Sequence, residues 1–438
     1  MAEVEYESVF RIHGPLIFAG KTSDVGLGDV VRIKVRDGDE RLGQVIEIRK
    51  EFSIIQVFEG TMGIDKSSSI IFSGEPMKFP VTSDMVGRIL DGKGAPIDGG
   101  PNLTSELKIE VRGAPINPVL RDPPRNFIQT GISAIDGMLT MAQGQKLPIF
   151  SGGGLPHNQL AAQLTRQSKV LGSDEQFVVI FSGMGLTHED ADFFIREFRR
   201  ADIMDHSVIF LNKGNDPSGE RLLTPRLALT AAEYLAFDLG YHILVILVDM
   251  TNYCEALREI SMSREEVPGR RGYPGYLYTD LATIYERAGR IKGKKGSITQ
   301  IPILSMPDFD ITHPIPDLTG FITEGQITLS PILANKGIYP PIDVLPSLSR
   351  FMTRAIGLGK TGDDHIEIAN KLYSTYARGR EMRELVLVIG KEALSSNERR
   401  VLQFAEEFET KFIAQDPYEE RKIEDTLKLG QELLSNIE

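Results

Sequence analysis

One glycine-rich stretch of the sequence has the form of a phosphate-binding loop. It follows the apolar run 147–150, precedes a helix-like run, and consists of Ser151, Gly152, Gly153, Gly154, Leu155, Pro156, His157 and Asn158. A working loop has a glycine, four residues, and then Gly-Lys-Ser/Thr. The lysine reaches the phosphates and the hydroxyl binds Mg²⁺, so the chemistry depends on what stands at these positions.

Every chemically demanding position of this loop is changed. Ser151 stands at the first glycine and Pro156 at the second. His157 replaces the lysine, and Asn158 replaces the Ser/Thr. Proline has no N–H to offer a phosphate, and histidine is mostly neutral at pH 7. We expect no efficient ATP hydrolysis here. Two interpretations stay open: a purely structural strand-to-helix turn, or weak nucleotide binding.

Two further positions point away from catalysis. Asp249 follows the apolar run 243–248, where phosphate-loop enzymes place an acid that holds Mg²⁺. Because the partner hydroxyl is missing, we expect Asp249 to cap the next turn, and we expect no metal site. Leu186 lies near where a hydrolase would place a carboxylate to polarise water. Gly153 and Gly183 add backbone freedom and restore no catalytic group.

Two other features are expected to be structural. Gly359, Lys360 and Thr361 resemble the end of a phosphate loop, but Arg354 stands where its first glycine is needed. No buried strand leads into them, so we expect a glycine-rich connection. Cys254 is the only cysteine, so it can form neither an internal disulfide nor a cysteine cluster for zinc. We expect it to be packed and unreactive.

Composition limits the classes of partner. The 438 residues carry a formal net charge of −12, which argues against broad binding to nucleic acid or to an anionic membrane surface. No apolar run approaches the ~18 residues of a membrane span, and the N-terminus is acidic where a secretory signal would be basic and then apolar. We expect a cytoplasmic protein that reaches a membrane only through partners.

Patterning predicts three regions, with boundaries at 1–73, 74–352 and 353–438. In the first, residues 31–36 alternate apolar and basic, and Asp37-Gly38 is a hairpin signal. Further short strands are predicted over 45–48 and 54–58. Several short strands separated by turns predict a small β-barrel.

The second region alternates apolar strands with helices. Strands are predicted over 147–150, 177–181, 207–211 and 243–248. One helix is predicted to begin at residue 188, and two more are predicted over 228–237 and 253–263. Near-continuous apolar strands joined by helices predict a parallel sheet covered on both faces, an α/β fold. Ligand sites in such sheets lie at the carboxyl ends of the strands.

The third region is expected to be a helical bundle. One stripe of core residues is predicted at Ile366, Ala369, Tyr373 and Tyr376, and a second at Val401, Ala405, Phe408 and Phe412. Ser395 and Glu398 have the spacing of a capping box that starts the second helix.

Six segments resemble a known family. They are residues 129–136, 144–148, 268–276, 300–306, 312–319 and 340–349. Together with the altered loop, they resemble the B subunit of the archaeal/vacuolar-type (A/V-type) rotary ATPase over essentially the whole chain. The resemblance implies a β-barrel, a RecA-like domain and a C-terminal helical domain. It also implies three B subunits that alternate with three catalytic A subunits around a central stalk, with a peripheral stalk, at the cytoplasmic face of the cell membrane.

The resemblance also implies how such a subunit contributes. Arg350, directly after residues 340–349, would reach across the interface to the nucleotide on the neighbouring A subunit. Residues 268–276, with Arg270 and Arg271, would face the bore in which the stalk turns. No cofactor would be required, although weak ATP or ADP binding at the altered loop or at the A–B interface is compatible with the family.

Three competing functions have discriminating features. An autonomous ATPase would need Gly-Lys-Thr after Leu155, which is absent. A hexameric RNA translocase would need basic or aromatic nucleic-acid contacts on the barrel, against a net charge of −12. A purely structural ring spacer differs only in whether Arg350 acts.

Overall fold

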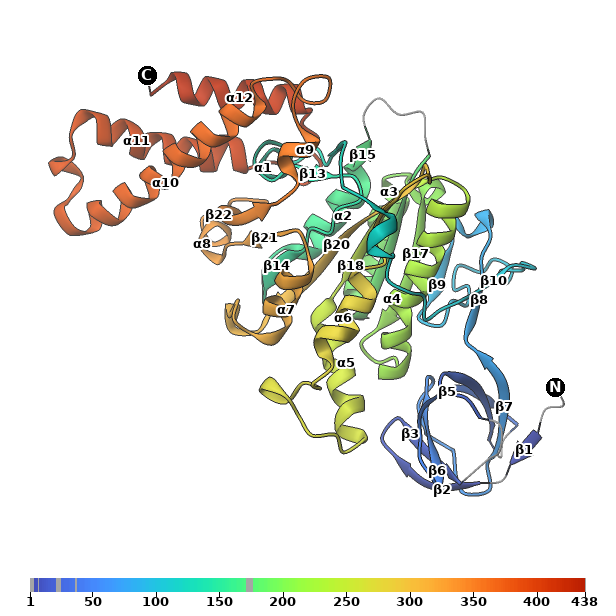
Figure 1. Cartoon of the computed structure of the whole chain (residues 1–438). Coiled ribbons are helices and arrows are strands. Elements are labelled where there is room, and N and C mark those ends of the chain that lie inside the picture. Colours follow the sequence, from blue (N-terminus) through green and yellow to red (C-terminus); the bar gives the residue numbers. More distant parts are fainter. Residues whose placement is uncertain (1–3, 7, 21–24, 36–37, 171–175, 438) are drawn as a thin grey trace.

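A computed structural model describes residues 4–6, 8–20, 25–35, 38–170 and 176–437 (Figure 1). The barrel and the C-terminal helices lie at opposite ends of a central domain built on one large sheet. The α/β class and its three-part organisation are therefore as the sequence predicts. No helix among the described residues is both long enough and apolar enough to cross a membrane.

The N-terminal domain is a seven-stranded sheet that curls around an apolar core. Its order is β1-β7-β4-β5-β6-β3-β2. The strands are β1 (Val4–Tyr6), β2 (Val9–His13), β3 (Leu16–Gly20), β4 (Asp29–Lys34), β5 (Glu40–Ile48), β6 (Phe52–Val57) and β7 (Ser69–Pro76). The antiparallel pairing of β4 with β5 confirms the predicted hairpin, although Asp37 and Arg36 lie outside the described residues.

The central sheet has the order β22-β21-β14-β20-β18-β16-β17-β9. Its strands are β9 (Ile89–Asp91), β14 (Ile149–Gly152), β16 (Phe177–Leu186), β17 (Ser207–Lys213), β18 (His242–Val248), β20 (Ser297–Met306), β21 (Gly325–Leu329) and β22 (Ile342–Ser349). Neighbouring strands are parallel except β21 and β22, which are antiparallel. The four strands predicted in this domain are confirmed; β9, β20, β21 and β22 are additional.

Helices cover both faces of this sheet. They include α2 (His157–Gln167), α3 (His188–Arg200), α4 (Ser218–Glu233), α5 (Met250–Ser263), α6 (Leu277–Tyr285) and α7 (Pro314–Ile322). Strand β18 shows why its sequence is continuously apolar: Leu244 and Ile246 point into the core with α2 and α3, whereas Val245 and Leu247 point into the core with α4, α5 and α6. The helix predicted over 228–237 begins earlier, at Ser218, and ends in a π-helical turn, Tyr234–Asp238.

The C-terminal region follows the short helix α9 (Met352–Ala355) and contains α10 (His365–Ile389), α11 (Ser396–Glu407) and α12 (Ile423–Ser435). The capping box of Ser395 with Glu398 is confirmed, with both reciprocal hydrogen bonds present. The second predicted stripe is also confirmed. Its four residues, Val401, Ala405, Phe408 and Phe412, are all buried.

The first predicted stripe is partly wrong. Ile366 is 38% exposed and Tyr373 is 43% exposed. The buried residues of this part of α10 are Ile368, Ala369, Leu372 and Tyr376. α10 packs chiefly against α11 and α12, and its buried face here runs through positions 368, 369, 372 and 376, so the apolar residues at 366 and 373 fall outside that face.

Candidate functional site

The altered phosphate loop lies where the sequence places it, between β14 and α2 at the carboxyl edge of the parallel strands. Two of its amides are used inside the loop. The N–H of Leu155 donates to the carbonyl of Gly152 (3.1 Å), and the N–H of His157 donates to the carbonyl of Leu155 (2.9 Å). A phosphate loop holds its ligand through such N–H groups, so this one has fewer to offer.

The residues at the lysine and hydroxyl positions are also engaged within the protein. The Nδ1 atom of His157 lies 3.0 Å from the Oγ of Ser151, within hydrogen-bond distance. Asn158 donates from Nδ2 to Asp190 Oδ1 at 2.7 Å, which ties α2 to the first turn of α3. Each side chain is thus engaged through one nitrogen, whereas the Oδ1 atom of Asn158 has no hydrogen-bond partner among the described residues.

An aromatic ring covers the start of the loop. A Cβ atom placed on Gly152 would lie 2.1 Å from Cε1 of Phe309, so the ring rests directly on this glycine. Phe309 belongs to the turn Pro307–Phe309 after β20, where it and Asp308 both have φ +55°. This left-handed region is rare for a bulky residue. The position of Phe309 could not be predicted from the sequence, because no local pattern links it to the loop.

Gly183 and Leu186 form one packed unit. Leu186 is buried, and a Cβ atom on Gly183 would lie 2.5 Å from its Cδ1. Gly183 therefore provides space for the leucine rather than conformational freedom. Gly153 is different: its added Cβ would meet nothing within 4 Å.

Asp249 caps a helix, as predicted. It is the N-cap of α5 and accepts from the N–H of Thr251 (2.7 Å) and from the N–H of Ser305 (3.2 Å). Among the residues that the structure describes, no group of three or more histidine, cysteine, aspartate or glutamate side chains could hold a metal ion.

Arg350 lies at the amino edge of the sheet, where the parallel strands begin. Because β22 runs antiparallel to β21, its last residue, Ser349, pairs with Gly325, the first residue of β21. Ile327 of β21 pairs in turn with Ile149 of β14. Ser349 is therefore level with position 147 of the chain segment that leads into β14, five residues before Gly152. At about 3.3 Å per residue, the two levels are about 16 Å apart along the strand direction. The structure therefore brings the loop residues together and places Arg350 apart from them.

The backbone that carries Arg350 is held firmly. Its N–H donates to the carbonyl of Glu324 (3.0 Å). The adjacent Ser349 hydroxyl donates to the carbonyl of Thr140 (2.9 Å), and Gln145 Nε2 bridges this hydroxyl and the Glu324 carbonyl at 3.0 and 3.1 Å. Gly325 completes the close approach of the two strands: it has φ +134°, and its added Cβ would lie 2.0 Å from a backbone carbonyl of β22.

The side chain of Arg350 itself is exposed and makes no hydrogen bond or ion pair with any described residue. Leu348, on the same face of the strand two residues earlier, is 53% exposed. An unpaired guanidinium beside an exposed apolar side chain is typical of a surface that meets a protein partner.

The loop over residues 268–276 is irregular, as its prolines and glycines predict. Arg270 pairs with Asp317 (2.8 Å), and Arg271 pairs with Asp310 (2.6 Å). Hydrogen bonds from Thr312 and the pair with Arg271 hold the pKa of Asp310 at about 2. This loop is thereby tied to the turn that carries Phe309.

The 359–361 segment and Cys254, which the sequence predicts to be structural, are both engaged within the protein. The Lys360 ammonium donates to the carbonyl of Arg354, and Thr361 Oγ1 accepts from the N–H of Gly357 (3.1 Å), which closes a turn with no strand before it. Cys254 is fully buried, and burial raises the pKa of its thiol well above the ordinary value, which makes it unreactive.

Family models match all three parts of the chain. The beta-barrel domain of the ATP synthase alpha/beta family matches residues 9–74, and the nucleotide-binding domain of that family matches residues 131–349. The C-terminal domain of V and A type ATP synthase matches residues 354–438. The chain therefore belongs to the ATP synthase alpha/beta family, and its C-terminal domain is of the V and A type.

A solved structure supports the same assignment. The chain is 40% identical to "a unique ATP synthase subunit NeqB" from Nanoarcheaum equitans, with a TM-score of 0.78. The match covers 97% of this chain and 99% of that chain. The resemblance to the A/V-type B subunit seen in the sequence is thereby confirmed.

Proposed function

We propose that this chain is the non-catalytic, regulatory B subunit of an A/V-type ion-translocating ATP synthase or ATPase. Three copies alternate with three A subunits, and Arg350 of each completes an active site on a neighbouring A subunit. The observation that carries the proposal is the exposed guanidinium of Arg350, which has no partner in the described part of the chain. It extends from a firmly held backbone at the sheet edge opposite the chain's own loop.

The chemistry of arginine suits this role. Its guanidinium is always charged, and its planar fork matches two phosphate oxygens. An arginine supplied in trans to a phosphoryl-transfer transition state contributes a factor of about 10³–10⁵ in rate, roughly 4–7 kcal/mol. Because the group belongs to B, opening the A–B interface withdraws the charge from A and slows its chemistry. Hydrolysis or synthesis on A is thereby coupled to the geometry of the interface.

The chain's own loop would take no part in catalysis. The internal hydrogen bonds of Leu155 and His157 and the ring of Phe309 all support this assignment. Binding of ATP or ADP at this loop, or at the A–B interface, is weak and is not required for function.

Other partners follow from the same role. The 268–276 loop faces the central stalk, and the peripheral stalk holds the ring still. Leu387 and Val388, near the end of α10, are 87% and 82% exposed, which supports a protein contact at this end of the helical domain. The chain reaches the cytoplasmic face of the cell membrane only through the complex, which moves protons or sodium ions.

Steady-state kinetics of reconstituted A–B complexes test this function. Arg350→Ala should assemble normally and lose at least two orders of magnitude in ATPase kcat. The matched control is Arg196→Ala, which removes an exposed arginine on α3 that has no hydrogen bond or ion pair with the described residues and should leave kcat unchanged. A wild-type kcat for Arg350→Ala would leave B as a structural spacer.

A further inference from the structure

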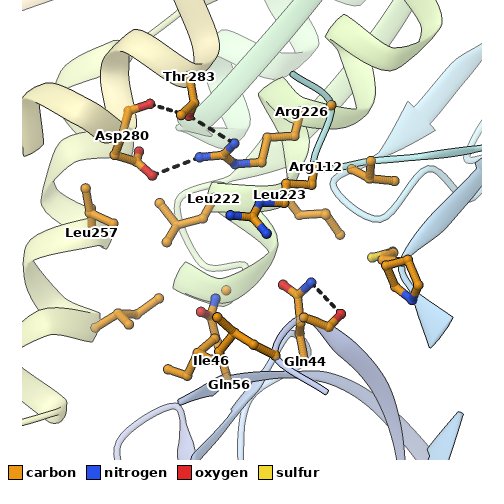
Figure 2. Close-up of a pocket in the computed structure, with 18 of the residues that line it drawn as sticks. Gln44, Ile46, Gln56, Arg112, Leu222, Leu223, Arg226, Leu257, Asp280 and Thr283 are labelled. Atoms are coloured by element: carbon orange, nitrogen blue, oxygen red, sulfur yellow. Dashed lines mark hydrogen bonds and ion pairs between the residues drawn. The ribbon is translucent and has the colours of Figure 1, made fainter. Parts of the chain in front are cut away.

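A pocket of about 1020 Å³ lies between the barrel and the central domain (Figure 2). Its walls come from β5 and β6 of the barrel, from the linker around residues 110–115, and from α4, α5 and α6 of the central domain. Pockets that bind small molecules usually have volumes of about 300–1,000 Å³. This space is therefore large enough for an organic ligand that would contact both domains at once.

Gln56 brings a side-chain amide to the wall of the pocket. Gln56 is only 7% exposed, and its side chain forms no hydrogen bond with any described residue. Its cross-strand neighbour Gln44 donates from Nε2 to the carbonyl of Gly28 (2.9 Å). Of these two side-chain amides, only that of Gln44 has a hydrogen bond with a described residue. The amide nitrogen and oxygen of Gln56 are not fully buried, so they contact the space of the pocket. The Gln56 amide thus provides a donor and an acceptor for a molecule in the pocket (Figure 2).

The charges in the pocket leave one cation unpaired. Arg226 is paired with Asp280 at 2.8 Å, and Arg264 is paired with Glu266 at 2.9 Å. Arg112 has no hydrogen bond or ion pair with the described residues. In Figure 2 its guanidinium enters the same space as that of Arg226.

The remaining lining carboxylate belongs to Glu110, which is exposed at the end of its strand, two residues from Arg112. It has no ion pair with a described residue. Its negative charge would therefore weaken, without preventing, the binding of an anion at Arg112.

The rest of the lining includes many apolar side chains. Ile46 faces the space from the barrel, and Leu222 and Leu257 face it from α4 and α5 (Figure 2). A ligand must therefore present an apolar body to these walls and a planar anionic group to Arg112, since guanidinium binds carboxylate through two parallel hydrogen bonds.

We infer that the pocket between the barrel and the central domain binds a small amphipathic organic anion, a carboxylate on an apolar body. The carboxylate pairs with Arg112, a polar atom of the ligand bonds to the Gln56 amide, and the apolar body packs against Ile46, Leu222 and Leu257. Such a ligand ties the barrel to the central domain. The inference does not depend on the role of Arg350.

Fluorescence of 8-anilinonaphthalene-1-sulfonate, an amphipathic anion with an aromatic body and a charged sulfonate, tests the site on the full chain. We expect saturable binding with one site per chain, displacement by decanoate, and no displacement by 1-decanol, which lacks the charge. Arg112→Ala should weaken binding of the dye and of decanoate at least tenfold, whereas Arg196→Ala should leave both unchanged. Glu110→Gln should tighten binding about twofold, because it removes the opposing charge.

Energy transfer locates the dye, because the chain has no tryptophan. Leu27→Trp places a donor at the rim of the pocket, and Leu387→Trp places the same donor on exposed α10, in the distant C-terminal domain. Transfer to bound dye from Leu27→Trp alone supports the site. Equal transfer from both donors, unsaturable binding, or unchanged affinity in Arg112→Ala would overturn it.

Discussion

The carboxyl edge and the amino edge of the central sheet, where its parallel strands end and begin, differ in whether their polar side chains are paired. At the carboxyl edge, side chains of the altered loop bond within the protein: His157 bonds to Ser151, Asn158 bonds through Nδ2 to Asp190, and a phenylalanine ring covers Gly152. At the amino edge, hydrogen bonds hold the backbone, but the Arg350 side chain has no hydrogen bond or ion pair with the described residues. A side chain that the protein positions and leaves unpaired is available to a neighbour. The contrast supports the proposal that the chain contributes to catalysis through Arg350 and not through its 151–158 loop.

The largest effect should come from the identity of residue 350. In assembled A–B complexes, Arg350→Lys should recover only part of the activity that Arg350→Ala loses, because lysine keeps the charge but not the planar fork. The loss should appear mainly in kcat and not in KM, because the contact is made chiefly to the transition state. Equal kcat for the lysine and alanine variants would show that the fork has no role.

The next largest effect should come from a glycine that supports this edge. Gly325→Ala should lower the free energy of unfolding by about 2 kcal/mol or more, since the left-handed φ and the clash with the β22 backbone are both unfavourable. Chemical denaturation measures this directly. Gly153→Ala, at the other edge, should change stability by no more than about 0.5 kcal/mol, because its Cβ meets nothing. Equal losses in the free energy of unfolding for the two variants would show that the close approach at Gly325 does not constrain the backbone.

Repairing the loop should change binding more than chemistry. The triple variant Pro156→Gly, His157→Lys and Asn158→Thr should bind Mg-ATP about tenfold or more tightly by calorimetry, and its affinity should fall on chelation of Mg²⁺. It should still hydrolyse ATP at background rate, as should the wild-type isolated chain, because Leu186 provides no carboxylate. Turnover near ~1 s⁻¹ in the unmodified chain, free of the A subunit, would contradict the non-catalytic assignment.

The smallest effect should come from uncovering the loop. Phe309→Ala should raise the affinity for ADP a few-fold, because the ring no longer occupies the face of Gly152. Phe321→Ala removes a ring that is 73% exposed on α7 and should leave the affinity unchanged. Equilibrium titration of both variants checks the difference, and an unchanged affinity in Phe309→Ala would show that the ring does not limit access.

Much of the fold could be predicted from the sequence where a residue's neighbours are near in the chain. The capping box at Ser395, the cap at Asp249 and the buried strand β18 all depend on local pattern, and all are present. The stripe through Ile366 and Tyr373 failed, because the width of a buried helix face depends on which helices pack against it.

The candidate site divides in the same way. The loss of the lysine and the hydroxyl could be predicted from the sequence alone, because the motif is contiguous. The contact of Phe309 with Gly152 joins residues far apart in the chain, and no spacing predicts it. That the Arg350 side chain has no partner among the residues in the structure's described ranges also depends on the sheet topology, which places it at the amino ends of the parallel strands.

The most direct measurement of the central claim is a structure of the assembled A–B complex with Mg²⁺, ADP and aluminium fluoride bound. One structure then reports on both edges of the sheet. The account predicts that the Arg350 guanidinium lies within hydrogen-bond distance of the phosphoryl analogue on the A subunit, and that the 151–158 loop holds no Mg²⁺-nucleotide. An Arg350 side chain directed away from the analogue, together with Mg²⁺-nucleotide bound at the 151–158 loop, would contradict it.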